Sequence, residues 1–255
     1  MLTLEQISQY LPPVLVNRNP RAAIVEYLQY ELLDALFKLK GASALSFIGG
    51  TAIRILHNSP RFSEDLDFDN FSLSYADFET LLRRACHEME YKGFIIELRF
   101  VEKGAYHCYI RFPEILRQAG LAATKDQKIL IRVDTEARER TYEPRSFLLN
   151  RFTLYRQVSA APPAILLSQK MLTMLQRKRE KGRDIFDVSF LMGFTQPDYE
   201  YLRKITSLEK DDFLKVFSNR LDELDLNVLA RDVEPFLFDS DQKARVTSFK
   251  QYWER

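Results

Sequence analysis

The chain has 255 residues, a length that suits one large domain or two small ones. Hydrophobic residues make up 46% and aromatic residues 13%, which excludes an intrinsically disordered chain, and a formal net charge of +1 argues neither for nor against nucleic-acid binding. Because the sequence has only two cysteines, Cys86 and Cys108, and three histidines, we expect neither a disulfide framework nor a Cys/His zinc site.

The spacing of apolar residues predicts an α+β protein whose first part is mixed and whose last part is helical. Residues 1–45 are expected to be helical, with a break at Pro12-Pro13 and a main helix over 22–39. After them we expect strands at 44–48, 64–69, 94–101, 106–112 and 128–136, and helices at 51–57 and 75–92. No apolar run approaches the roughly 18–20 residues of a membrane span and no signal peptide is recognisable, so we expect a cytoplasmic protein without membrane contact.

The pattern changes after Pro162-Pro163, where only helical spacing follows. We expect helices at 164–178, 184–192, 199–206 and 211–221. A pair of prolines favours a break between domains. The predicted domains are therefore residues 1–160 and residues 161–255.

The acidic strand is the first candidate for chemistry. Asp65 and Asp67 alternate with apolar residues, which places both carboxylates on one face of the strand, about 6.5–7 Å apart. Two carboxylates at this spacing suit a divalent metal ion, but surface strands also carry such pairs without a ligand. Asp69 shares their face, and because it precedes Asn70 we expect it to be a turn residue.

The Gly49-Gly50-Thr51 turn between a strand and a helix is the second candidate. Glycine lets backbone N–H groups approach an anion, and the start of the following helix adds its positive end. Thr51 either contributes to this cradle or simply caps the helix. Ser63 and Arg61 are candidates for phosphate contact, with capping or solvent exposure as their alternative roles.

Lys170 and Asp184 form a third candidate group within a basic stretch. On one straight helix these two residues would lie about 21 Å apart, too far for a single small substrate. A shared site therefore requires the helix to break between them, and Gly182 is the expected place. Asp184 would then begin a second helix, and Asp187 either joins the site or pairs with a nearby basic residue.

Asp134 ends the polar face of the strand over 128–136. A third strand carboxylate could complete a metal site or activate a hydroxyl group. A plain charge on an edge strand is the competing interpretation.

Taken in order, these motifs resemble those of the AbiEii/AbiGii-type nucleotidyltransferase toxins, to which the MenT toxins are similar. The resemblance rests on 47–54 (FIGGTAIR), on 60–68 (PRFSEDLDF), and on Lys170 with the Arg183-Asp184-x-x-Asp187 run. It implies a polymerase-β-like nucleotidyltransferase core, with a small mixed sheet and flanking helices, and a helical C-terminal half that completes the active site.

The resemblance also implies roles for individual residues. Gly49, Gly50 and Ser63 would contact the triphosphate of an NTP substrate, and Asp65 and Asp67 would hold Mg²⁺, or Mn²⁺ in its place. Lys170 would bind phosphate and Asp184 would be the last acidic motif, whereas Asp134 corresponds only by its place in the sheet. The implied biology is a toxin of a toxin–antitoxin or phage-defence system, paired with a winged-helix antitoxin, that transfers NMP to the tRNA 3′ end.

Two other functions remain open at this stage. The same chemistry could act on a protein or a small hydroxyl compound, or the chain could be a catalytically silent nucleotide-binding regulatory module. Charge favours RNA only weakly. Residues 117–156 carry nine basic and five acidic side chains, while residues 209–241 carry ten acidic and four basic ones.

Overall fold

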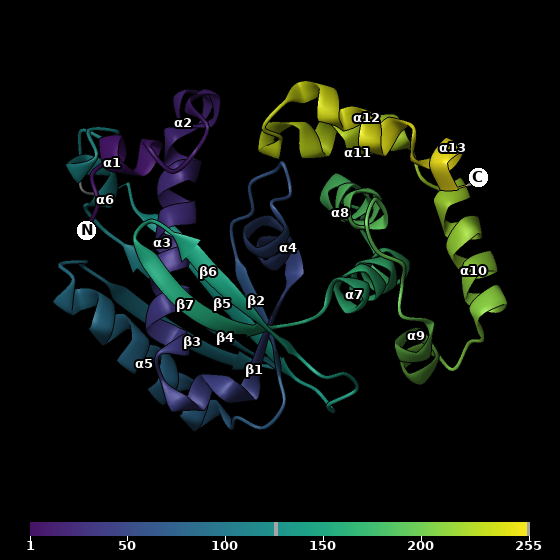
Figure 1. Ribbon diagram of the computed structural model, residues 1–255, viewed down its shortest axis with the longest axis horizontal. Helices are drawn as coiled ribbons and strands as arrows, with labels where there is room; N and C mark the ends of the chain where they lie inside the picture. The colour runs from purple at the N-terminus through teal and green to yellow at the C-terminus, as the bar shows by residue number, and fades with distance from the viewer. Residues whose placement is uncertain (125–126, 254–255) are drawn as a thin grey trace. The chain divides into compact units, whose positions relative to one another are not determined.

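The computed structural model describes residues 1–124 and 127–253 (Figure 1). Lys125 and Asp126, which belong to the basic 117–156 stretch, lie outside the described residues. The chain divides into two compact units. The first comprises residues 1–56, 63–139 and 144–160, and the second takes up 57–62 and 140–143 together with the segment that starts at Ala161.

A mixed seven-stranded sheet forms the centre of the first unit, in the order β3-β4-β5-β2-β1-β7-β6. Its strands are β1 (Leu45–Ile48), β2 (Leu66–Asn70), β3 (Glu97–Lys103), β4 (Ala105–Phe112), β5 (Ile129–Ala137), β6 (Arg145–Arg151) and β7 (Leu154–Ala160). β1 runs antiparallel to β2 and parallel to β7, and β2 runs parallel to β5. The expected α+β class, with a mixed sheet and flanking helices, is confirmed.

Helices flank this sheet and cover its apolar face (Figure 1). They are α1 (Leu4–Ser8), α2 (Pro13–Arg18), α3 (Pro20–Phe37), the 3-10 helix η1 (Lys40–Ala44), α4 (Gly49–His57), α5 (Tyr75–Tyr91) and α6 (Ile115–Gln118). Phe37 of α3 contacts Phe68 of β2, and Phe78 of α5 contacts Tyr106 of β4. Alternation along the strands turns one set of side chains into this core and leaves the other set, which includes Asp67 and Asp134, on the opposite face.

The hairpin of β6 and β7 was not among the predicted strands. Its two-residue turn, Phe152-Thr153, has positive φ angles of 55° and 65°. Such turns usually carry Asn or Gly, so the sequence lacks the expected marker. The Phe152 ring is fully buried against Tyr10, Tyr27 and Tyr30, and this packing offsets the cost of the turn conformation.

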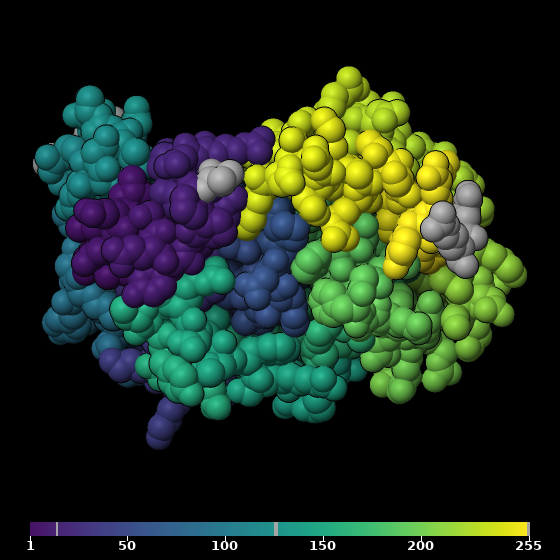
Figure 2. Space-filling view, turned by 45° about the horizontal axis from the view of Figure 1, so that its top comes forward, coloured from purple at the N-terminus to yellow at the C-terminus, as the bar shows by residue number. Residues whose placement is uncertain are grey.

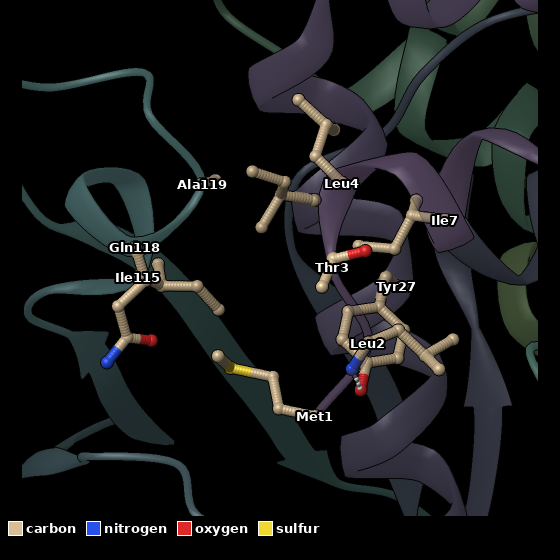
Figure 3. A pocket seen from close by; sticks show the side chains of 10 residues that line it. Met1, Leu2, Thr3, Leu4, Ile7, Tyr27, Ile115, Gln118 and Ala119 are labelled. Carbon is tan, nitrogen blue, oxygen red and sulfur yellow. Dashed lines mark hydrogen bonds between the residues drawn. The ribbon is translucent and has the colours of Figure 1, made fainter.

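The N-terminal residues close a small cavity in the first unit. In Figure 2 they (purple) lie at the surface against the teal segment that contains α6. The cavity has a volume of about 80 Å³, and Figure 3 shows Leu4, Ile7 and Ile115 among its mainly apolar lining. The Leu2 amide donates a hydrogen bond to the Tyr27 hydroxyl at 3.0 Å, and burial raises the pKa of that hydroxyl.

From Ala161 onward the regular elements of the described residues are all helices, as expected. They are α7 (Pro163–Gln176), α8 (Gly182–Met192), α9 (Tyr199–Thr206), α10 (Lys210–Asp222), α11 (Leu226–Val233), η2 (Glu234–Phe236), η3 (Ser240–Lys243), α12 (Ala244–Thr247) and α13 (Phe249–Trp253). The segment 57–62 is tied to them by backbone bonds: the Phe62 amide donates to the Phe236 carbonyl at 2.8 Å, and the Phe238 amide donates to the Pro60 carbonyl at 3.1 Å. None of the helices described in the chain is long and apolar enough to cross a membrane.

The expected break between α7 and α8 is present, but Gly182 has a different role in it. α7 ends at Gln176, six residues earlier than the glycine, and Gly182 is the first residue of α8. A β-carbon at position 182 would overlap the Leu229 carbonyl of α11. The glycine therefore permits close packing of α8 on α11 instead of terminating a helix.

Candidate active site

The carboxylate of Asp67 lies directly against the backbone of Gly49. The two residues meet because Ile48, the last residue of β1, is the register partner of Asp67 in β2. Gly49 has φ +78°, and a β-carbon there would overlap the Asp67 Oδ2. Both the backbone conformation and the contact require glycine at this position. The first residue of α4 and the Asp67 side chain of β2 therefore pack directly against each other.

The other residues of this turn fix the backbone next to the acids. The buried Thr51 hydroxyl donates a hydrogen bond to the Asp65 carbonyl, so it holds the chain just before β2 and does not act as a simple helix cap. Gly50 is buried in the first turn of α4. α4 itself is fixed to α3 by a buried ion pair in which Arg54 Nε and Glu26 Oε2 are 2.9 Å apart.

Gln29 holds the loop that carries Ser63. Its side-chain amide, buried in α3, donates to the Ser63 and Glu64 carbonyls, each at 2.9 Å. Ser63 itself is half-buried, two residues ahead of Asp65. This arrangement fixes the backbone of the predicted phosphate-contacting serine and leaves its phosphate role a prediction.

Asp134 lies beside Asp67, because the two are register partners in the parallel pair of β2 and β5. Arg132 links this carboxylate to Asp65: its Nη2 is 3.0 Å from Asp65 Oδ2, and its Nε is 2.7 Å from Asp134 Oδ2. His107 Nδ1, from β4, lies 2.8 Å from Asp134 Oδ1. The first unit thus gathers three acids on one face of the sheet, with an arginine and a histidine at their edge.

The three acids affect the pKa of the neighbouring Arg132. Burial by itself would lower the pKa of its guanidinium, but Asp65, Asp134 and Asp67 outweigh burial and raise it. The three acids therefore stabilise a positive charge placed beside them.

A second group of charged residues lies within the second unit. The helix break brings Lys170 of α7 to Asp184 of α8, with 3.0 Å between Nζ and Oδ1, and to Asp187 at 2.9 Å. Arg177 Nε lies 3.2 Å from Asp184 Oδ2. The condition that we set for a shared role of Lys170 and Asp184 is thus met inside this unit.

Arg61 completes this second group and differs from both roles considered for it. Its side chain is buried, donates two hydrogen bonds to Asp187 at 2.7 and 2.5 Å, and donates a third to the Phe62 carbonyl at 2.8 Å. The alternative of a solvent-exposed arginine is therefore wrong. A phosphate contact, which stays a prediction, would require this guanidinium to give up Asp187.

Burial opposes both charges of the Lys170–Asp187 pair, and the partners overcome it. Burial alone would lower the pKa of Lys170, but Asp187 and Asp184 raise it. Burial alone would raise the pKa of Asp187, but Arg61 and Lys170 lower it. Both groups are accordingly charged at neutral pH.

Asp69 corrects a further expectation. It belongs to β2 and is not a turn residue; it is buried, and its Oδ1 lies 3.2 Å from Arg138 Nε. The strand extends one residue further than predicted because Asn70, whose side chain accepts bonds from the Ser72 and Leu73 amides, forms the turn.

Sequence reasoning missed three residues that shape these groups. Arg132 was not named as a candidate, although its alternation with Asp134 along the strand predicts a shared face. His107 and Gln29 become partners of the site only through strand register and helix packing, which the sequence does not display.

The residues present suit a divalent metal ion of the Mg²⁺ type. Among the residues 1–124 and 127–253, no group of three or more His, Cys, Asp or Glu side chains forms a ready-made metal cage. Mg²⁺ is usually bound by one or two carboxylates and completes its shell with water and substrate phosphates. The pair Asp65 and Asp67, beside a glycine turn, matches that donor set.

Comparison with known proteins identifies the family. A family model described as the nucleotidyl transferase AbiEii toxin of type IV toxin–antitoxin systems matches residues 31–253. The chain belongs to the AbiEii family. As an AbiEii protein it is a nucleotidyltransferase, an enzyme class that uses a nucleoside triphosphate and a divalent metal ion, and its toxin–antitoxin family implies a cognate antitoxin.

Solved structures share the fold of this AbiEii protein. MenT4, a nucleotidyltransferase toxin from Mycobacterium tuberculosis, is 18% identical with a TM-score of 0.61, over 100% of this chain and 90% of MenT4. JHP933 from Helicobacter pylori is 16% identical with a TM-score of 0.56, over 91% of each chain. Among curated proteins, no sequence matches the chain.

Proposed function

We propose that this AbiEii protein transfers NMP from an NTP to an RNA acceptor, the 3′ end of tRNA, in a Mg²⁺-dependent reaction. We further propose that the protein is a cytoplasmic toxin of a phage-defence system and that a winged-helix antitoxin inhibits it. The observation that carries it is the contact of the Asp67 carboxylate with Gly49, at the first turn of α4. It joins a metal-binding acid to a backbone that suits phosphate oxygens.

The reaction forms a bond between an acceptor hydroxyl oxygen and the α-phosphorus and breaks the bond from that phosphorus to pyrophosphate. Mg²⁺, when bound, supplies positive charge that neutralises the phosphates. Asp65 and Asp67 would hold it, and the amides of Gly49 and Gly50, with the Ser63 hydroxyl, would bind the triphosphate. These contacts orient the NTP for in-line attack.

Asp134 is the residue that we assign to the acceptor proton. Its Oδ1 faces His107 and its Oδ2 faces Arg132, so the carboxylate is held in one orientation. Lys170 is assigned to phosphate binding, with Asp184 as its positioning partner.

A labelling experiment tests the proposal. The purified protein is incubated with each α-labelled NTP, Mg²⁺ and total tRNA, alongside the variants Asp65→Asn and Asp67→Asn. We expect label in tRNA with the wild-type protein and a loss of at least 100-fold in either variant. Asp212→Asn, an exposed acid of α10, is the matched control and should transfer label normally.

Three other results of the labelling experiment would contradict parts of the proposed function. Label in protein or in a small compound, lost in Asp65→Asn, would refute an RNA acceptor and retain the chemistry. Nucleotide binding with no label in any acceptor would refute transfer altogether. Oxidation of the terminal 2′,3′-diol of the tRNA to a dialdehyde by periodate should abolish labelling, and persistent labelling would exclude the 3′ end as acceptor.

A further inference from the structure

The outer face of β3, β4 and β5 is a basic and aromatic surface that ends at the acids. Strand register places Arg99, Tyr109 and Arg132 side by side in one row across the three strands. The next row towards the acids consists of Val101, His107 and Asp134. Tyr109 therefore lies two residues along β4 from the histidine that contacts Asp134.

The alternation of β4 fixes which side chains point outward. Cys108, Ile110 and Phe112 are buried beneath the sheet, so Tyr109 and Arg111 belong to the opposite face. Leu130 of the neighbouring strand remains 45% exposed on that face, next to Arg111 in the register. This part of the sheet is thus accessible to a partner.

The charges of this face are largely available for a ligand. Within the described part of the chain, neither Arg99 nor Arg111 makes an ion pair or a side-chain hydrogen bond. Glu97, the register partner of Arg111, is paired with Lys128, whose Nζ lies 2.8 Å from its Oε1. An aromatic ring flanked by unengaged guanidinium groups suits a chain of phosphates with exposed bases.

We propose that this surface, Arg99, Tyr109 and Arg111, binds the single-stranded end of the acceptor RNA and leads it to Asp134. The inference rests on the proposed function for its choice of RNA. The Tyr109 ring stacks on an unpaired base, and the two arginines contact neighbouring phosphates. A single strand fits better than a duplex, because paired bases inside a helix offer no free face for stacking.

Direct binding measurements test the inference without nucleotide, metal or catalysis. A fluorescent single-stranded RNA of about eight nucleotides is titrated with the full chain, and anisotropy gives Kd. Tyr109→Ala should weaken binding about tenfold, whereas Tyr109→Phe, which keeps the ring, should match the wild type. Tyr109→Leu keeps most of the bulk and should also lose about tenfold, so it replaces the alanine variant if that variant unfolds.

The arginines are tested through salt. The logarithm of the association constant falls with the logarithm of the salt concentration, and each phosphate contact on a single strand contributes about −0.7 to this slope. The double variant Arg99→Gln/Arg111→Gln should therefore make the slope less negative by about 1.4. Matched controls on the same sheet are Tyr155→Ala, a 72% exposed tyrosine of β7, and Arg145→Gln of β6, and both should bind like the wild type.

Several results would overturn the inference. One is an unchanged Kd in Tyr109→Ala, and another is equal losses in Tyr109→Ala and Tyr155→Ala. A blunt RNA duplex that responds to Tyr109→Ala as strongly as the single strand would exclude stacking on an unpaired base. Displacement by an oligo-aspartate peptide, with no dependence on Tyr109, would indicate an acidic protein partner instead.

The same variants separate this inference from the transfer proposal. In the labelling assay, Tyr109→Ala should raise KM for RNA about tenfold and leave KM for the NTP unchanged. If no RNA is labelled but RNA binding depends on Tyr109, the transfer proposal fails and the binding surface stands. If Asp65→Asn abolishes labelling while Tyr109→Ala changes neither Kd nor KM for RNA, the transfer proposal stands and this surface is excluded.

Discussion

Gly49 shows how a single residue couples two requirements. Its positive φ angle would cost another residue about 1–2 kcal/mol, and a side chain there would also displace the Asp67 carboxylate. The sequence predicted a phosphate cradle at this glycine, but not that the glycine also makes room for the acid. The second role depends on the pairing of β1 with β2, which places Ile48 opposite Asp67.

Gly49→Ala is therefore expected to cost more than its backbone conformation alone. Gly104, at φ +71° with open space around it, is the matched control. In urea unfolding we expect Gly104→Ala to lose about 1 kcal/mol and Gly49→Ala to lose at least 1 kcal/mol more. Gly49→Ala should also lower nucleotidyl transfer about 100-fold, because Asp67 is displaced. Equal losses of stability in the two variants would contradict the close contact.

Asp187 is the central charge of the second unit. It is fully buried between Arg61 and Lys170, which hold its pKa below the ordinary value against the effect of burial. A carboxyl group with a lowered pKa in the folded state stabilises the protein above the unfolded pKa of about 3.9, and this contribution is lost as pH falls through the folded value.

Asp187→Asn should lower the free energy of unfolding by about 3–5 kcal/mol at pH 7, because two buried cations lose their counter-charge. The difference from the wild type should be constant near neutral pH and should shrink below about pH 4. Unfolding curves at a series of pH values measure it. The exposed Asp212→Asn serves as control and should change stability by about 0.5 kcal/mol or less. A difference that persists at pH 2 would contradict the ionised state of Asp187.

At the scale of elements, agreement with the sequence follows the strength of the local pattern. The long amphipathic helix α5 was predicted within one residue at its end, helped by the Ser74 cap, whose hydroxyl accepts a bond from the Asp77 amide. The β6–β7 hairpin was missed because its turn has neither glycine nor asparagine. The helix break before α8 was predicted correctly, but the expected role of Gly182 was wrong. The glycine allows α8 to pack closely on α11 and does not end α7.

The candidate site also contains residues that could be predicted from local motifs and residues that could not. Residues carried by local motifs, such as Gly49, Asp65 and Asp67, could be named from the sequence. Their partners Arg132 and His107 come from other strands, so they appear only when the register of the sheet is known. Whether the named residues act together in catalysis stays a prediction.

The turn of the β6–β7 hairpin offers a gain in stability. Thr153 is an exposed β-branched residue at φ 65°, a conformation that glycine adopts without strain. Thr153→Gly should raise the free energy of unfolding by about 0.5–1 kcal/mol, as measured by urea titration. Thr153→Ala retains a β-carbon at the same φ and should bring little or no gain. A loss of stability in the glycine variant would contradict a strained turn.

At the scale of the whole molecule, the proposed chemistry draws on residues from both units. Asp65 and Asp67 belong to the first unit, and Lys170 and Asp184 to the second. If Lys170 binds phosphate, its loss must affect the same reaction as the loss of the acids.

Lys170→Met is expected to reduce nucleotidyl transfer at least 100-fold and to raise KM for the NTP, and Lys170→Arg should restore part of the activity. Steady-state labelling gives both parameters, and circular dichroism confirms that each variant is folded. Lys178→Met, which follows α7 in the basic stretch, is the control and should transfer normally. Full activity in a folded Lys170→Met protein would assign the lysine to stability alone.

The pairing of Arg61 with Asp187 joins two residues that the ribosome synthesises far apart in time. The two residues are separated by 126 positions, so the arginine leaves the exit tunnel long before its counter-charge is synthesised. Until then the 57–62 segment has neither Asp187 nor the Phe236 and Phe238 backbone to hold it. Chains released before residue 187 therefore cannot form this ion pair, and their second unit stays unfinished.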